Sequence, residues 1–162
     1  MSKPLEGIRV LDLTNVLAGP FCCHHLAHMG AEVIKVEAAG RGDLARQLGA
    51  DPELNKAGMG VSFLAQNAGK KSVTVNLKNT RGREIFLKLV ETADVVVENF
   101  RPGVMTRLGV GYETLKSINQ KLIYCAISGF GQDGPWVHRP AYDQIIQGAS
   151  GVMSITGADD SA

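Results

Sequence analysis

Short apolar runs alternate with amphipathic stretches along most of this chain. Apolar and β-branched residues cluster in five runs, at residues 8–13 (IRVLDL), 33–37 (VIKVE), 71–77 (KSVTVNL), 94–98 (DVVVE) and 122–127 (LIYCAI). Each run has the length and composition of a β-strand. Helical spacing of apolar residues predicts helices over residues 20–29, 83–93, 104–108 and 112–119.

The alternation of strands with helices predicts an α/β fold. Near-continuous apolar strands indicate a doubly wound, mostly parallel sheet with helices on both faces. Pro20 lies near the first turn of the first helix, and Gly30 follows its last turn. Asn79 and Thr80 are candidate N-caps of the next helix.

Two stretches fit neither a helix nor a strand, residues 38–60 and residues 128–140 (SGFGQDGPWVHRP). Each of them follows a predicted strand. In doubly wound sheets, ligands bind beyond the carboxyl ends of the strands. Both stretches are therefore candidate ligand-binding loops.

The composition is that of an ordinary soluble domain, with 44% hydrophobic and 20% charged residues among 162. A formal net charge of +1 argues against a general nucleic-acid binder, which would carry a large basic excess. The N-terminal MSKPLEGIRVLDL has no signal-peptide core, and no apolar run approaches the roughly 20 residues needed to span a bilayer. The three cysteines, two of them adjacent, do not read as a disulfide framework. We therefore expect a cytoplasmic protein with reduced thiols and no membrane or nucleic-acid partner.

The turn after the first strand is rich in small residues (TNVLAGP, 14–20). It has neither the glycine spacing of a dinucleotide fingerprint nor that of a phosphate-binding Walker loop. One interpretation is a plain strand-to-helix turn. The other is a turn that lets a ligand approach the backbone of Val16 and Ala18, beside a helix N-terminus that favours anionic groups. The residues alone leave both open.

Five cationic residues lie in or beside predicted loops: Arg41, Lys70, Lys71, Arg101 and Arg107. Separated cations suit a ligand with several phosphates, such as coenzyme A with its 3′-phosphate and pyrophosphate. The alternative is solvated surface charge, because most single Lys and Arg side chains are exposed.

Other polar residues carry weaker signals. Successive residues of a helix point about 100° apart, so the CCHH run at residues 22–25 cannot converge on one ion. His24 and His28 share a helix face but lack a third ligand, and we expect no metal site. Cys125 is expected in the core. Asp143 fits a helix N-cap better than a carboxylate acting in catalysis.

Taken together, the segments resemble the class III CoA-transferase family, which includes formyl-CoA transferase, carnitine CoA-transferase and α-methylacyl-CoA racemase. The matching segments are PLEGIRVLDLTNVLAGPFCC, LAHMGAEVIKVEAAGRGD, NAGKKSVTVNLKNTRGREIFLKLVETADVVVENFRPGVMTRLG and ISGFGQDGPWVHRPAYDQIIQGASGVMSITG. They cover nearly the whole chain in order. The resemblance implies a Rossmann-like fold in which residues 1–162 are the N-terminal part of the large CoA-binding domain, truncated before the family's second domain.

The resemblance also implies which residues contact coenzyme A. The matched positions are Val16, Leu17, Ala18, Asn99, Phe100 and Arg107, with Arg41 and Lys71 as further candidates. Asn99 and Phe100 match a nucleotide-contacting pair, and Arg107 matches a phosphate-binding arginine. Acyl-CoA is then a substrate, and no tightly bound cofactor is implied.

By the same resemblance, the family moves CoA from a thioester to a small carboxylic acid through an aspartyl intermediate. That aspartate is expected beyond this chain, because Asp159 and Asp160 match loop positions, so we expect these 162 residues to be inactive. Tyr142 stands where the racemase branch has a histidine base, and tyrosine with an ordinary pKa of about 10 is a poor base. Tyr142 and Asp143 are expected as neighbours of the active site.

Two alternatives stay open: a racemase-type enzyme of the same family, and a nucleotide-binding module without a catalytic role. The family assembles as two interlocked chains, so the resemblance implies an interlocked homodimer. Ile145, Ile146, Val152 and Met153 are then expected to pack partly against structure outside this chain. The sequence predicts neither the acyl donor nor the acceptor acid.

Overall fold

The computed structural model describes residues 2–157. The chain forms two compact units, residues 2–127 and residues 128–157. The first unit contains the sheet and its covering helices. The second is a short helical segment, and each unit is treated by itself below.

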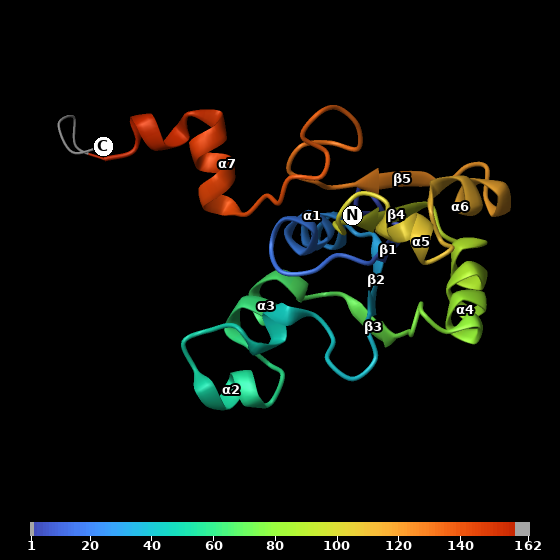
Figure 1. The fold of residues 1–162 in the computed structure, drawn as a ribbon. Coiled ribbons are helices and arrows are strands. Elements are labelled where there is room, and N and C mark those ends of the chain that lie inside the picture. Colours follow the sequence, from blue (N-terminus) through green and yellow to red (C-terminus); the bar gives the residue numbers. More distant parts are fainter. Residues whose placement is uncertain (1, 158–162) are drawn as a thin grey trace. The chain divides into compact units, whose positions relative to one another are not determined.

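A five-stranded sheet organises the first unit, with strand order β3-β2-β1-β4-β5 and every pairing parallel (Figure 1). The strands are β1 (Arg9–Asp12), β2 (Glu32–Glu37), β3 (Lys71–Thr74), β4 (Val95–Glu98) and β5 (Ile123–Ala126). Four lie within the runs expected from the sequence, and β2 begins one residue before the run at 33–37. The α/β fold with a doubly wound parallel sheet is therefore confirmed.

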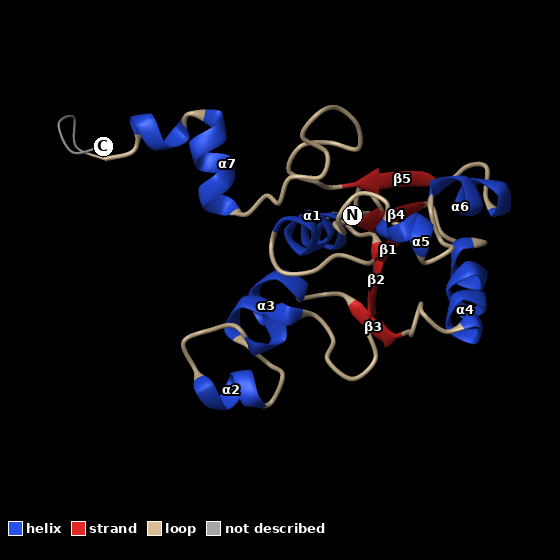
Figure 2. Cartoon of the chain, in the orientation of Figure 1, coloured by secondary structure: helices blue, strands red, loops and turns tan. Residues whose placement is uncertain are grey.

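Helices cover both faces of this sheet (Figure 2). They are α1 (Ala18–His28), α3 (Val61–Asn67), α4 (Thr80–Val90), α5 (Val104–Arg107) and α6 (Tyr112–Ile118). Phe86 of α4, Met105 of α5 and Leu115 of α6 pack with strand residues in the larger core cluster. Cys23 of α1 packs with Val10, on β1, in the cluster on the other side. Asn79 is the N-cap of α4, as expected, because its side chain accepts from the N–H of Arg81.

The expectation that residues 38–60 lack helices was wrong. A 3-10 helix, η1 (Leu44–Gln47), and a short α2 (Pro52–Lys56) form there. Asp43 caps η1 by accepting the backbone N–H two residues further on, and Asp51 caps α2 by accepting the N–H groups two and three residues further on. The sequence signal was an Asp at each N-cap position, with Pro at the first position of α2.

The second unit contains α7 (Asp143–Ser150) and a 3-10 helix, η2 (Val152–Ile155), after an irregular stretch. Asp143 is not the N-cap of α7: Tyr142 takes that position, and Asp143 is the first helical residue. Its carboxylate accepts from the side-chain amide of Gln147, one turn along. Thus the sequence predicted the helix correctly but its start one position late.

The apolar side chains singled out in this unit are mostly exposed in the described structure. Ile145, Val152 and Met153 are exposed, while Ile146 is half-buried. Structure outside this chain remains the predicted cover for them. Asp159 and Asp160 lie outside the described residues.

No helix in residues 2–157 is long and apolar enough to cross a membrane.

Candidate functional site

The strand order places a topological switch point between β1 and β4. The chain leaves β1 toward β2 on one side and leaves β4 toward β5 on the other. In open α/β sheets the crevice at such a point, beyond the carboxyl ends of the strands, is where ligands bind. Two turns border it, one joining β1 to α1 and one joining β4 to α5. The matched residues Val16 to Ala18, Asn99 and Phe100 therefore lie in or next to these two turns, whereas Arg107 is at the far end of α5.

Val16 has the only positive φ angle among the non-glycine residues that the structure describes, at 69°. A β-branched residue in this left-handed region is a strong outlier, since its side chain crowds the backbone. Strained residues of this kind concentrate at binding and catalytic sites. The side chains of Val16 and Leu17 are exposed, at 37% and 57%. The turn thus faces solvent at the residues matched to coenzyme A.

Asn99 is hydrogen-bonded to Asn15, the residue before Val16 in the β1–α1 turn. The N–H of Asn15 donates to Oδ1 of Asn99 at 2.8 Å, and Nδ2 of Asn99 donates to the carbonyl of Asn15 at 2.8 Å. Both ends of the Asn99 amide are therefore used across the switch point. The resemblance implies that Asn99 contacts coenzyme A, and in the structure its amide bonds to the backbone of Asn15.

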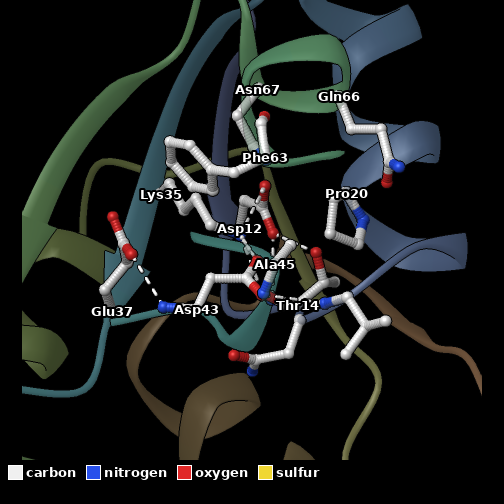
Figure 3. A network of polar contacts seen from close by, with 12 residues as sticks. Asp12, Thr14, Pro20, Lys35, Glu37, Asp43, Ala45, Phe63, Gln66 and Asn67 are labelled. Carbon is white, nitrogen blue, oxygen red and sulfur yellow. Dashed lines mark hydrogen bonds and ion pairs between the residues drawn. The ribbon is translucent and has the colours of Figure 1, made fainter. Parts of the chain in front are cut away.

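Beneath the turn lies a buried network of charged side chains (Figure 3). Nζ of Lys35 donates to the carbonyl of Thr14 at 2.8 Å and lies 2.9 Å from Oδ2 of Asp43. Oδ1 of Asp43 accepts from the N–H of Val16 at 3.0 Å. Nζ of Lys70 contacts Oδ2 of Asp12 at 2.8 Å. Buried charges of opposite sign are tolerated because they are paired and hydrogen-bonded.

These contacts leave the first N–H groups of α1 without partners. The N–H groups of Leu17, Ala18 and Gly19 form no hydrogen bond with a residue that the structure describes. With its amide rotated, Gln66 donates to the carbonyls of Val16 (3.0 Å) and Leu17 (3.2 Å). Since α1 has no acidic residue in its first turn and no side-chain cap, its N-terminus keeps its partial positive charge. Such an end can bind a phosphate or a carboxylate.

Gly19 allows the close approach of helix and strand on which this geometry depends. A Cβ at Gly19 would lie 2.3 Å from Cβ and Cγ2 of Thr14. Thr14 is itself fixed, since its N–H and hydroxyl both donate to Oδ1 of Asp12. The glycine is therefore required by packing at the turn.

Arg41 and Arg107 supply exposed positive charge. Neither guanidinium makes a hydrogen bond or an ion pair with a residue that the structure describes, and both residues are exposed. Arg41 lines a surface cavity of about 400 Å³ together with Arg46, Lys56 and Ser72. Arg107 ends α5 and lies against Gly103, whose Cβ would meet its guanidinium at 3.2 Å. Both remain available to an anionic ligand.

Lys71 is the candidate that the structure does not bring to this edge. It is the first residue of β3, and Nζ lies 2.6 Å from Oε1 of Glu32, the first residue of β2. The amino ends of parallel strands lie at the edge of the sheet opposite the ligand crevice. Its neighbour Lys70 reaches inward instead and donates to Asp12, to Asn67 and to the carbonyl of Pro20.

Buried carboxylates at the strand ends are the polar residues that sequence reasoning missed. Asp12, Glu37 and Glu98 are each the last residue of a strand, and each is at most 4% exposed. Each accepts a backbone N–H from the turn that follows its strand: Thr14, Asp43 and Phe100, respectively. The signal in the sequence was an acidic residue closing each of these apolar runs.

The pKa values of two of these carboxyls, Glu37 and Glu98, are shifted in opposite directions. Burial raises the pKa of Glu37, but hydrogen bonds from Arg46, Ser72 and the Asp43 N–H outweigh it and hold the pKa at about 2. Burial likewise raises the pKa of Glu98, and hydrogen bonds from Phe100 and Tyr124 do not compensate for it. Glu98 has no cation beside it among the described residues.

The described residues do not assemble a metal site or an activated nucleophile. In residues 2–157 no three His, Cys, Asp or Glu side chains are grouped to hold a metal ion. Nε2 of His28 lies 3.0 Å from Nε2 of His24, a contact between two rings on one face of α1. Burial raises the pKa of the Cys125 thiol, which disfavours the thiolate. Tyr142 and Asp143 belong to the second unit and are exposed there.

Comparisons with known proteins agree with this geometry. The sequence profile of CoA-transferase family III matches residues 5–162. The chain belongs to CoA-transferase family III. The recognition made from the ordered segments is therefore confirmed, as is the fold that it implied.

Relatives in this family cover nearly all of the chain. It is 49% identical to mouse (Mus musculus) succinyl-CoA:glutarate CoA-transferase over 158 residues, which is 98% of this chain and 36% of that protein. It is 50% identical to acetyl-CoA:oxalate CoA-transferase of Acetobacter aceti, covering 97% of this chain and 39% of that one. A CAIB/BAIF family protein from Brucella suis superposes with a TM-score of 0.88 at 41% identity, covering 99% of this chain and 42% of that structure. The chain thus spans between a third and a half of the relatives that it matches.

Proposed function

We propose that this chain is the coenzyme-A-binding part of an acyl-CoA:carboxylate CoA-transferase. The observation that carries the proposal is the set of N–H groups of Leu17, Ala18 and Gly19, which have no acceptor in the described structure and lie at the switch point of the sheet. Family membership supplies the ligand class. Relatives named for succinyl-CoA, acetyl-CoA and formyl-CoA share this part of the chain.

In this proposal the β1–α1 turn binds the CoA moiety through its backbone. Val16 and Leu17 leave their side chains exposed, so the ligand can approach the main chain of Ala18. Arg107 and Arg41 bind phosphate groups of CoA, because a guanidinium can donate two parallel hydrogen bonds to one phosphate. Phe100 is half-buried against the larger core cluster, and its exposed part is available to the nucleotide. Lys71 has no part in it, since its ammonium lies at the opposite edge with Glu32.

The transfer chemistry of the whole enzyme is proposed to be covalent. An aspartate carboxylate attacks the thioester carbonyl, the CoA thiolate leaves, and an acyl aspartyl anhydride forms. The thiolate then attacks the aspartyl carbonyl and releases the donor acid, which leaves CoA on the enzyme as a thioester. The acceptor carboxylate attacks that thioester, expels CoA thiolate and forms a second anhydride with the aspartate. The thiolate then attacks the acceptor's acyl carbon in this anhydride, which gives the product thioester and frees the aspartate. Dividing the transfer in this way keeps the activated acyl group bound.

The buried carboxylates among the described residues are not placed to act as that aspartate. The three buried aspartate and glutamate side chains at the strand ends accept backbone N–H groups, and Asp43 is paired with Lys35. We therefore propose that the 162 residues bind CoA without transferring it. An acyl-CoA and a small carboxylic acid are the proposed substrates of the whole enzyme, which is proposed to be a cytoplasmic, interlocked homodimer.

Two measurements test the proposal on the 162-residue chain. Isothermal titration should show that CoA binds and that NAD does not, because the site has no dinucleotide fingerprint. NAD binding without CoA binding would contradict the assignment. Incubation with succinyl-CoA and a panel of carboxylic acids should give no thioester exchange, and exchange above the enzyme-free rate would refute the proposed absence of a nucleophile.

A further inference from the structure

Asp43 is buried and charged, yet the proposed binding of CoA does not involve its carboxylate directly. The residue is 1% exposed. Its Oδ1 accepts from the N–H of Val16 at 3.0 Å and from the N–H of Ala45 at 2.9 Å. Its Oδ2 lies 2.9 Å from Nζ of Lys35, and its own N–H donates to Glu37 at 2.9 Å. One carboxylate thus connects the β1–α1 turn, strand β2 and the start of η1.

Apart from its hydrogen bond to Asp43, few contacts stabilise the left-handed conformation of Val16. Its φ of 69° is unfavourable for a β-branched residue, and its side chain is too exposed for packing to enforce that angle. Hydrogen bonds to its backbone must therefore hold it. Asp43 accepts the N–H, while the rotated amide of Gln66 donates to the carbonyl.

The same carboxylate fixes Arg41 relative to this turn. Arg41 lies two residues before Asp43, in a tight loop closed by a hydrogen bond from the Gly42 N–H to the Ala38 carbonyl at 3.0 Å. Gly42 has a φ of 64°, and a Cβ there would lie 2.7 Å from Oε2 of Glu37. The loop therefore has little freedom, and its end is attached to Val16 through Asp43.

We propose that Asp43 is a positioning residue for CoA binding. It sets the left-handed conformation of Val16 and thereby the direction of the N–H groups of Leu17 to Gly19, and it holds the Arg41 loop at a fixed place beside them. The inference rests on the proposed function, since it takes the β1–α1 turn as the CoA site. It adds a buried residue whose role is to orient the groups that touch the ligand.

Substitutions at Asp43 separate positioning from general stabilisation. Asp43→Asn keeps the Oδ1 acceptor for Val16 but loses the ion pair with Lys35. Asp43→Ser keeps a good N-cap for η1 but is too short to reach Val16. Both lower the urea midpoint, because both remove the nearer of the two carboxylates beside the Lys35 ammonium, at 2.9 Å, and leave only Asp12 at 4.0 Å. Only Asp43→Ser is expected to raise the Kd for CoA by about tenfold, whereas Asp43→Asn stays within about threefold of the parent.

Asp51→Ala is the matched control. Asp51 is exposed and caps α2 by accepting the N–H groups of Glu53 and Leu54. Its loss lowers the urea midpoint but should leave the Kd for CoA within about twofold, because no contact joins it to the turn. A purely structural role for Asp43 predicts instead that affinity follows the urea midpoint in all three variants, and that result would overturn the proposal.

Hydrogen exchange at the Val16 amide tests the positioning without the ligand. The amide should be protected in the parent chain and in Asp43→Asn, and it should exchange at least about tenfold faster in Asp43→Ser. Equal exchange in all three would refute the role of Asp43 even if CoA binds. Absence of CoA binding by the parent chain would refute the proposed function and the role of this turn in it, while the exchange result would still decide whether Asp43 holds Val16. If Asp43→Ser fails to fold, Asp43→Asn remains decisive, because a tenfold loss of affinity in that variant contradicts the proposal.

Discussion

Asn99 and Asn15 are joined by two hydrogen bonds across the switch point of the sheet, each 2.8 Å long. One side-chain amide satisfies both the N–H and the carbonyl of a single residue in the facing turn. Residues 84 positions apart are thereby fixed where β1 and β4 end. The two turns that border the switch point are therefore held together by hydrogen bonds.

We expect Asn99→Leu to lower both stability and CoA affinity. The partly buried N–H and carbonyl of Asn15 lose their partner, which costs about 1–3 kcal/mol in the free energy of unfolding. Urea denaturation measures this, and titration with CoA should show a weaker complex because the turn is no longer held. Asn119→Leu is the matched control, since the Asn119 side chain likewise bonds to backbone groups distant in the sequence: its Nδ2 donates to the carbonyls of Val90 and Ala93. It should destabilise the chain without a separate effect on CoA affinity, and an equal loss of affinity there would contradict the role of Asn99.

Gly19→Ala should be strongly destabilising. The new Cβ would lie 2.3 Å from two side-chain carbons of Thr14, so α1 or β1 must shift. Overpacking of this kind costs about 1–3 kcal/mol and can cost more. Gly148→Ala is the comparison: the nearest described atom to its Cβ would be Sδ of Met153 at 3.7 Å, so it should stabilise α7 by about 0.5–1 kcal/mol. Thermal unfolding of both variants checks this. A Gly19→Ala variant as stable as the parent chain would show that the turn can rearrange to accommodate the added Cβ.

The sequence predicted the sheet because each strand is a short apolar run bounded by turn residues. It predicted α4 with its cap, since Asn79 precedes an amphipathic segment. It missed η1, α2 and α3. Both η1 and α2 are about one turn long and show no periodicity, leaving only the capping Asp43 and Asp51 as a signal. Such short elements form where tertiary contacts hold them.

For the proposed site, the family resemblance pointed to the β1–α1 turn but not to the contacts that support it. The contacts of Val16 with Asp43 and of Asn15 with Asn99 join residues far apart in the sequence, and no spacing rule predicts them. Lys70 and Lys71 look equivalent in the sequence. Their positions relative to the sheet distinguish them: Lys70 points inward to Asp12, whereas Lys71 pairs with Glu32 at the edge opposite the switch point.

Glu37→Gln should remove a stabilisation that depends on pH. The folded-state pKa of Glu37 is about 2, below its ordinary value of 4.5. A lowered carboxyl pKa stabilises the fold above the ordinary value, and that contribution is lost as pH falls from about 4.5 toward 2. The variant should therefore be less stable than the parent at neutral pH and should lose less stability on acidification. Urea midpoints across this range measure it, and parallel curves for the two proteins would refute the assignment.

Glu98→Gln should have the opposite effect. The folded-state pKa of Glu98 is raised above 4.5, chiefly by burial, so ionisation of this carboxyl costs stability as pH rises through its ordinary value. The amide keeps an acceptor for the Phe100 N–H without a buried charge. The variant should be more stable than the parent at neutral pH, and the difference should vanish below pH 4.5. A variant that is less stable at neutral pH would mean that the Glu98 carboxylate has a compensating partner.

Lys70→Met and Lys71→Met should differ sharply although the two residues are adjacent. The Lys70 side chain is 1% exposed and contacts Asp12 at 2.8 Å, so its removal weakens a buried ion pair and should cost about 3 kcal/mol or more. The Lys71 side chain is 70% exposed, and its ion pair with Glu32 is worth at most about 1 kcal/mol. Because Lys71 lies at the edge opposite the switch point, Lys71→Met should also leave the Kd for CoA within about twofold. A larger loss of affinity in Lys71→Met would place CoA at the amino ends of β2 and β3 and would contradict the proposed site.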